Sequence, residues 1–288
     1  MKTSAIIRIV IYMLLLAMLV GLLGLGLHWY RTGTWDGLFS FGGFSYPDSD
    51  RYQVGSASLP AQALTELEIN WIAGSVTLQV TDGDSISFRE PQGLDQENQL
   101  RYLVSGNRLI LQYRKSGWAW GNIPGKDLTV EIPRSMLDRL TLVKLDTTSA
   151  HITARGLQAG TVEIDAVSGP AVLEDCRFDS LEMDTVSGGL RFSGFLDRLE
   201  YEAVSGDAQL AFGAVPQSLS FDAVSGRCSM TLPQDAAFSA SLDSVSGDFT
   251  SGFPISKQGD TYYCGTGGGS FRFDTVSGDI TINPAGTP

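Results

Sequence analysis

The tripeptide Val-Ser-Gly recurs in the second half of the chain, at 167–169, 186–188, 204–206, 224–226, 245–247 and 276–278. Successive copies are separated by 19, 18, 20, 21 and 31 residues. An acid stands three places before each Ser: Asp165, Asp184, Glu202, Asp222, Asp243 and Asp274. Asp146-Thr-Thr-Ser-Ala150 fits the same register, and Asn70-Trp-Ile-Ala-Gly74 is a more distant copy that we expect to open the domain. Such regular recurrence predicts a repeat fold with a period of about 19 residues.

Each copy alternates apolar or small residues with polar ones. Leu181-Glu-Met-Asp-Thr185 is followed, after the turn, by Gly188-Gly-Leu-Arg-Phe192. A period of two is typical of half-buried β-strands, and stacked units of this kind bury one continuous core. The sequence therefore predicts an all-β, β-solenoid-like stack of strand repeats. We expect the Gly of each turn to supply a backbone conformation that other residues avoid.

The repeat domain is expected to have two parts. Residues 63–145 show looser strand patterns, such as Leu67-Glu-Ile69 and Leu128-Thr-Val-Glu-Ile132, and form an irregular N-terminal β region. Residues 146–288 form the Val-Ser-Gly solenoid. The last interval is the longest, which predicts an inserted hairpin or long loop between Phe253 and Gly269.

The motif (Asp)-(Thr/Ala)-Val-Ser-Gly-Asp, best preserved in Thr275-Val-Ser-Gly-Asp-Ile280, resembles the bacterial β-strand-repeat family called "putative adhesin" or toastrack. The resemblance covers roughly residues 63 to 283. It implies a cell-envelope protein of unassigned domain function, often membrane-anchored and sometimes linked to envelope-stress signalling. It carries over no catalytic residues.

The N-terminus predicts one membrane span. Residues Ile9 to Leu27 are 19 consecutive uncharged positions, which as a helix would be about 28 Å long. His28, Trp29 and Tyr30 follow directly, and Trp and Tyr favour the membrane interface. We assign 1–8 to the cytoplasm, 9–28 to a transmembrane helix and 29–62 to a juxtamembrane connector. The competing interpretation is a cleaved signal peptide, but 19 residues exceed the usual length of its apolar region.

Charge and composition limit the function. The chain has 20 Lys and Arg against 32 Asp and Glu, which argues against a nucleic-acid partner. Lys2 and Arg8 precede the span and an acidic remainder follows, so we place the repeat domain outside the cytoplasm. The aromatic residues of the connector either cover the first rung of the domain or rest on the membrane interface.

The repeated acids form the first candidate site. Stacked in register, they would make a ladder of carboxylates whose repulsion must be offset. Either each carboxylate accepts hydrogen bonds from the following Ser-Gly turn, which we favour, or Ca²⁺ binds between neighbours. The candidate Ca²⁺ ligands are Asp165, Asp184, Glu202, Asp222, Asp243 and Asp274.

Other residue types give weaker signals. The repeated Ser lacks a matching set of bases, since His151 is the one His of the repeat region, so we predict no catalytic residues, no cofactor and no enzyme activity. Trp118 and Trp120 either contact a ligand or membrane, or cap the core. Cys228 is expected in the core, and a disulfide among Cys176, Cys228 and Cys264 stays open.

The chain stops directly after the last rung, so we expect that C-terminal rung to be uncovered and to support self-association or docking of a protein partner. Together these patterns predict a single-pass membrane protein with a non-enzymatic scaffold, adhesin or stress-sensing domain. The alternative is a β-solenoid protein that binds or processes a cell-wall polysaccharide.

Overall fold

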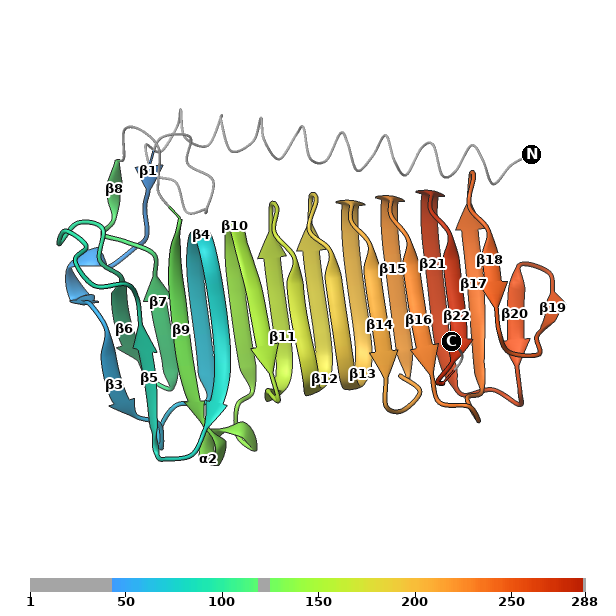
Figure 1. Cartoon of the computed structure of the whole chain (residues 1–288), viewed down its shortest axis with the longest axis horizontal. Helices are drawn as coiled ribbons and strands as arrows, with labels where there is room; N and C mark the ends of the chain where they lie inside the picture. Colours follow the sequence, from blue (N-terminus) through green and yellow to red (C-terminus); the bar gives the residue numbers. More distant parts are fainter. Residues whose placement is uncertain (1–42, 119–124, 287–288) are drawn as a thin grey trace.

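The computed structural model describes residues 43–118 and 125–286, which form a long stack of β-strands (Figure 1). The elements are β1 (Gly43–Phe44), η1 (Ser49–Arg51), β2 (Gln53–Val54), β3 (Ala57–Pro60), β4 (Glu66–Thr81), β5 (Ser85–Arg89), β6 (Arg101–Ser105), β7 (Arg108–Gln112), β8 (Gly117–Trp118), β9 (Lys126–Pro133), α2 (Arg134–Leu137), β10 (Leu142–Arg155), β11 (Gln158–Ala166), β12 (Ala171–Thr185), β13 (Leu190–Ser205), β14 (Ala208–Phe212), β15 (Ser218–Ser225), β16 (Cys228–Leu232), β17 (Phe238–Ser244), β18 (Phe249–Ser251), β19 (Ser256–Gln258), β20 (Thr261–Cys264), β21 (Gly269–Ser277) and β22 (Ile280–Pro284). The predicted all-β repeat fold is confirmed.

From β11 onward each rung consists of two strand segments joined by a Val-Ser-Gly turn, whereas β4 and β10 each run through the equivalent position as one strand. Neighbouring rungs pair in parallel and in register, so that Leu181 of β12 lies opposite Val162 of β11 and Leu199 of β13. The turns form one long edge of the domain, the upper edge in Figure 1. The core lies between the two layers of strand segments, because inward positions of both layers are buried in rung after rung.

The core consists of columns of like residues. Tyr201 stacks on Phe221, with ring centroids 5.2 Å apart and planes 9° apart, and Phe221 contacts Phe273 in turn. Tyr201 also donates its hydroxyl hydrogen bond to the carbonyl oxygen of Gly188, at 2.8 Å, so its polar end is satisfied inside the core. Cys228 is fully buried, as predicted, and all three cysteines are free thiols.

The turn glycines are required mainly because rungs approach closely. A Cβ placed on Gly188 would lie 2.6 Å from the carbonyl oxygen of Gly169 in the neighbouring rung. The same collision with a neighbouring Gly recurs at Gly206, Gly226, Gly247 and Gly278. Among the Val-Ser-Gly glycines, Gly169 is the one with a positive φ, at 114°. The expected conformational role of the Gly is therefore wrong for most copies. Gly is required there because a Cβ would collide with the backbone of the neighbouring rung.

The rungs do not stack in the order of the sequence. The last rung, β21 and β22, pairs on one side with β15 and β16 and on the other with β17 and β18, which precede it in the chain. The predicted insertion is the antiparallel hairpin of β19 and β20, and β20 covers the outer edge of β17 (Figure 1). This hairpin turns the chain back, which allows its final rung to enter between two earlier ones.

The N-terminal side is closed in the same way. β4 lies between β10 and an outer rung made of β7 and β9, although β7 and β9 follow β4 in the chain. Antiparallel strands then cover that outer rung, with β6 on β7 and β5 on β9. β10 runs through the predicted boundary at 145, so the irregular and regular parts share one sheet system.

This topology corrects the expectation for the C-terminus. The C-terminal rung is not an uncovered end, because both of its strands have partners on either side. In the described ranges no helix is long and apolar enough to cross a membrane. The predicted span at 9–28 lies outside the described residues.

We predict that Gly188→Ala destabilises the domain by about 2–3 kcal/mol, because the new methyl group would force neighbouring rungs apart. Gly156→Ala is the matched control, since Gly156 has a φ of +66° but open space around a new Cβ, and should cost about 1 kcal/mol. Urea unfolding of both variants measures the difference. Equal costs would show that close approach is not what requires the Gly.

Candidate functional site

The repeated acids form a straight column on the outer face of one strand layer. In spatial order the column runs Gln112, Asn70, Asp146, Asp165, Asp184, Glu202, Asp222, Asp274, Asp243. We call its seven carboxylates the acid column. The predicted alignment is confirmed, except that Asp274 lies between Asp222 and Asp243. Asn70 aligns with Asp146, as the distant copy of the motif indicated.

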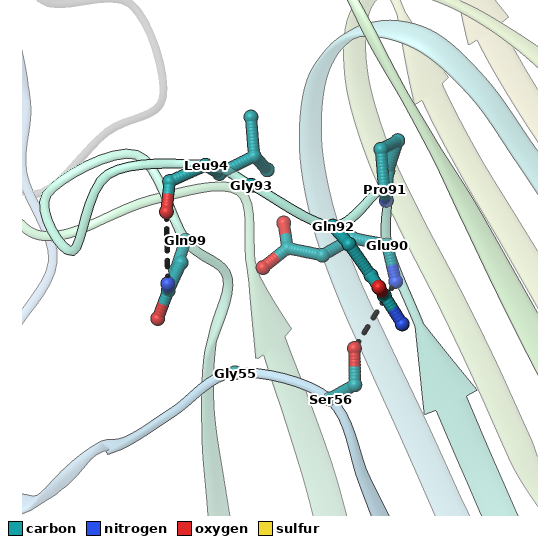
Figure 2. A pocket seen from close by; sticks show the side chains of 8 residues that line it. All are labelled: Gly55, Ser56, Glu90, Pro91, Gln92, Gly93, Leu94 and Gln99. Atoms are coloured by element: carbon teal, nitrogen blue, oxygen red, sulfur yellow. Dashed lines mark hydrogen bonds between the residues drawn. The ribbon is translucent and has the colours of Figure 1, made fainter.

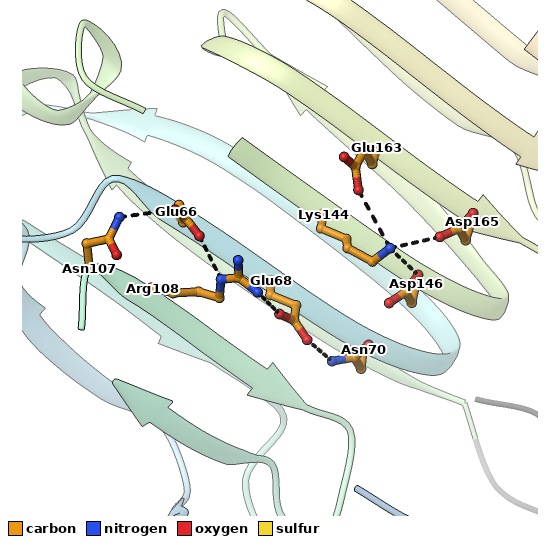
Figure 3. Close-up of polar contacts among 9 residues, drawn as sticks. All are labelled: Glu66, Glu68, Asn70, Asn107, Arg108, Lys144, Asp146, Glu163 and Asp165. Carbon is orange, nitrogen blue, oxygen red and sulfur yellow. Dashed lines mark hydrogen bonds and ion pairs between the residues drawn. The ribbon is translucent and has the colours of Figure 1, made fainter. Parts of the chain in front are cut away.

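A single lysine neutralises one end of the acid column. The Nζ atom of Lys144 lies 3.7 Å from Asp146, 3.6 Å from Glu163 and 3.2 Å from Asp165 (Figure 3). The side chain of Asp146 is only 6% exposed. Burial, reinforced by the neighbouring carboxyl of Asp165, raises the pKa of Asp146 to about 7. Sequence reasoning missed Lys144, which stands where Glu68 and Glu163 stand in the two neighbouring rungs.

The centre of the acid column has like charges on several sides. Burial, with the nearby carboxylates of Glu202 and Asp165, raises the pKa of Asp184 to about 6. Glu182 lies two residues earlier on the same outer face, and burial together with Glu200 raises its pKa as well. Towards the other end, burial and the neighbouring Asp274 raise the pKa of Asp222 to about 6.

A second polar group lies on the rungs that continue the acid column beyond Asp146. Arg108 donates hydrogen bonds from Nε to Glu66 at 2.7 Å and from Nη1 to Glu68 at 3.0 Å (Figure 3). Asn70 donates to Glu68 at 3.1 Å. Glu66 and Glu68 are therefore paired with Arg108 on the same face. At the position of the repeated acid this rung has the amide of Asn70, which donates to Glu68.

The acids do not accept hydrogen bonds from the turns. In the described part of the chain, the amide hydrogens of the turns bond mostly to carbonyls of adjacent rungs, and Gly188 N–H bonds to Oγ1 of Thr185 at 2.7 Å. The favoured turn role of the acid column is thus wrong. Within the same ranges no three His, Cys, Asp or Glu side chains group as a metal site would require. Ca²⁺ binding stays a prediction.

Three Ser residues of the motif bridge neighbouring rungs through their hydroxyl groups. Ser168 donates its hydroxyl to the carbonyl of Thr148 at 3.3 Å, and Ser187 donates to Val167 at 3.5 Å. Ser246 makes the equivalent bond to Val276 at 3.5 Å. His151 is exposed on β10 and aligns with Ser75 of β4. These contacts are those of a structural ladder.

A buried ion pair that the sequence did not reveal lies at the start of β9. Lys126 pairs with Glu90 and lies over the rings of Trp71 and Tyr113, with Nζ 4.8 and 4.5 Å from the centroids. Burial lowers the pKa of Lys126. Trp118 lies in β8, which pairs with β1 at the upper edge, whereas Trp120 lies outside the described residues.

The same end of the molecule contains a shallow cavity of about 240 Å³ between the chain at Gly55 and Ser56 and the loop from Glu90 to Leu94 (Figure 2). Its edges are tied by hydrogen bonds from Glu90 N–H to Ser56 Oγ at 3.2 Å and from Gln99 Nε2 to the Leu94 carbonyl at 2.9 Å. The Glu90 carboxylate is already paired with Lys126, so the cavity gains no free charge from it.

Two aromatic residues of the connector, Phe44 and Tyr46, lie in the described part of the chain and show whether they cover the domain. Phe44 is buried and packs edge-on against Tyr113, and Tyr46 donates its hydroxyl to the carbonyl of Arg114 at 3.0 Å. These two rings therefore cover the end of the domain. Trp35, Phe39 and Phe41 lie outside the described residues.

A family model described as Toastrack DUF4097 matches residues 64–283. Similar solved structures include a putative cell adhesion protein from Clostridium sporogenes (13% identity, 81% of this chain and 100% of that chain, TM-score 0.40). Another is a putative adhesin from Bacteroides fragilis (11% identity, 81% of this chain and 97% of that chain, TM-score 0.46). A third is a putative lipid binding protein from Parabacteroides distasonis (12% identity, 81% of this chain and 97% of that chain, TM-score 0.39). No curated protein matches the sequence.

The match covers most of the chain and all of its repeats, so the chain belongs to the Toastrack family. This confirms the resemblance drawn from the Val-Ser-Gly motif. The family description assigns no activity, and the sites above have to be interpreted from their own chemistry.

The acid column predicts greater stability at mildly acidic pH. Asp184 has a raised pKa in the folded state, so folding takes up protons as pH falls from 8 towards 5, and stability is lost as pH rises through about 6. Asp184→Asn should stabilise the protein at pH 8 by about 1 kcal/mol, a small figure because the side chain is partly solvated. The exposed Asp235→Asn is the charge-matched control. Thermal melts at pH 5 and 8 that show no difference between the variants would contradict this.

The Ca²⁺ hypothesis has its own direct test. If Ca²⁺ binds between acids of the column, millimolar Ca²⁺ should raise the melting temperature at pH 7.5 and a chelator should lower it, because ligand binding stabilises the folded state. Mg²⁺ at the same ionic strength is the control. An unchanged melting temperature under all three conditions removes the hypothesis.

Proposed function

We propose that the chain is a single-span membrane protein whose toastrack domain lies outside the cytoplasm and acts as a non-enzymatic scaffold, either as an adhesin or as an envelope-stress sensing module. The observation that carries the proposal is the repetition of the outer surface. Acid, Val and Ser positions recur from rung to rung in register, which presents a row of equivalent contacts. Such a surface suits repeated contacts with a long partner.

We propose the membrane anchor from two sequence features, the apolar run from Ile9 to Leu27 and the difference in charge between the segments on either side of it. The described chain begins at Gly43 in β1, at the upper edge of the domain in Figure 1. A stretch of 15 residues separates Leu27 from Gly43, which can span at most about 50 Å. The anchor would therefore keep the domain close to the membrane.

The alternative is a protein that binds or processes a cell-wall polysaccharide. Asp146 supports it, because a carboxyl with a pKa of about 7 next to Lys144 could exchange protons near neutral pH. This alternative function is the weaker candidate, because Lys144 already forms ion pairs with three carboxylates on an open strand face. Release of reducing ends from a cell-wall polysaccharide by the wild type, abolished in Asp146→Asn, would favour it.

Thiol labelling tests the proposed topology. The three native cysteines are buried, so Asp235→Cys would add an exposed thiol to the described domain. We expect a membrane-impermeant maleimide to label this variant in intact spheroplasts, and to label Thr3→Cys only after lysis. Wild-type protein reports the background. Labelling of Asp235→Cys that appears only after lysis would place the domain in the cytoplasm and overturn the proposal.

A further inference from the structure

The Val residues of the motif form an exposed apolar ridge. Val167, Val186, Val204, Val224, Val276 and Val245 follow one another in this spatial order along the upper edge. Val186, Val204 and Val245 are 36, 40 and 46% exposed, and the other three are half-buried. At about 4.8 Å per rung the ridge is about 24 Å long. We call these six residues the Val ridge.

Carboxylates flank the Val ridge along its whole length on one side and in three rungs on the other. The acid column lies two residues before each Val, about 7 Å away on the same outer face. On the other side the border is partial: three residues after Val204, Val276 and Val245 stand the exposed Asp207, Asp279 and Asp248, whereas Pro170 and Gly189 follow Val167 and Val186. Arg227 is the basic residue at this position in the described rungs. An apolar line with one continuous acidic border and a second, partial one favours a partner with the complementary pattern.

From this pattern we infer that the Val ridge is a docking surface for an amphipathic helix of a protein partner, apolar along one stripe and lined with Lys or Arg on both sides. Charge complementarity supports this occupant over a bilayer, because the acidic borders are repelled by anionic lipid headgroups. The inference rests on the proposed role as a binding scaffold and specifies its partner, but it does not depend on the anchor.

The spacing of the Val ridge also fits a helix. A helix presents one apolar residue to a partner per turn, every 5.4 Å, and successive Val residues are about 4.8 Å apart. About 16 helical residues match the length of the ridge. A helix lying across the turns would thus place an apolar side chain near most Val residues and its basic side chains near the acidic borders.

The test uses the full chain in nanodiscs of zwitterionic phosphatidylcholine, with empty nanodiscs as the reference. The probe is a fluorescent 18-residue peptide with Leu on one helical stripe and Lys elsewhere, and a scrambled peptide of the same composition is its control. We expect the amphipathic peptide to bind at least tenfold more tightly than the scrambled one. Carbodiimide crosslinks, mapped by mass spectrometry, should join its lysines to Asp184, Glu202 and Asp207.

Two sets of variants separate docking from general charge attraction. Val186→Ser with Val204→Ser and Val224→Ser should weaken binding at least tenfold, whereas the exposed Val54→Ser with Val104→Ser should change it less than twofold. Asp207→Asn with Asp279→Asn should weaken binding more than Asp197→Asn with Asp235→Asn, which removes the same charge elsewhere. Melting curves establish that each variant is folded.

Equal losses in ridge and control variants, or crosslinks spread over the whole acidic surface, would overturn the inference. Ridge variants that alter association with phosphatidylcholine vesicles while peptide binding is unchanged would also overturn it, and would make a lipid surface the occupant. Either result leaves the labelling experiment and the proposed location of the domain unaffected, so the two proposals can fail separately.

Discussion

The whole domain depends on rungs that lie in register within a single strand spacing of one another. At the turns this spacing leaves no room for a Cβ between Gly188 and the carbonyl of Gly169, and Ser187 uses the same proximity to donate a hydrogen bond to Val167. Inside, it brings Tyr201 and Phe221 face to face. Because each rung packs on the next in the same way, equivalent positions have the same surroundings and require the same type of residue. This explains why the motif recurs so clearly in the sequence.

The same registration has an electrostatic consequence. Outward residues at equal positions must lie over one another, so acids that are far apart in the sequence become close neighbours. Lys144 relieves this repulsion at one end, while burial and the surrounding carboxylates together raise the pKa of Asp184. The exposed Val residues are aligned by the same rule. A surface made of parallel acidic and apolar lines is thus a product of the repeat, and it is what the proposed scaffold offers to a partner.

The repeat predicted the strands, the core face and the alignment of the acids, because period-two patterning and motif register report directly on stacking. It could not predict the order of the rungs. Sequence spacing shows that an insertion precedes Thr275, but the choice between a rung added outside and a rung inserted inside depends on tertiary pairing of β21 with both β15 and β17. The buried pair of Lys126 and Glu90 was equally hidden, since its members come from different, non-repeating strands. The acids were assigned to the turns from local propensity, whereas neighbouring rungs supply most of the hydrogen bonds of the turns.

Pairs of introduced cysteines measure this rung order directly. Ser225 lies opposite Ser277, one rung away, whereas Ser246 is two rungs from Ser225 although it is nearer in the sequence. A disulfide requires Cα atoms within about 7 Å, which one rung spacing satisfies and two exceed. Mild oxidation should therefore link the Ser225→Cys and Ser277→Cys pair and leave the Ser225→Cys and Ser246→Cys pair reduced. The opposite result would mean that the rungs follow the sequence, and it would contradict the architecture described above.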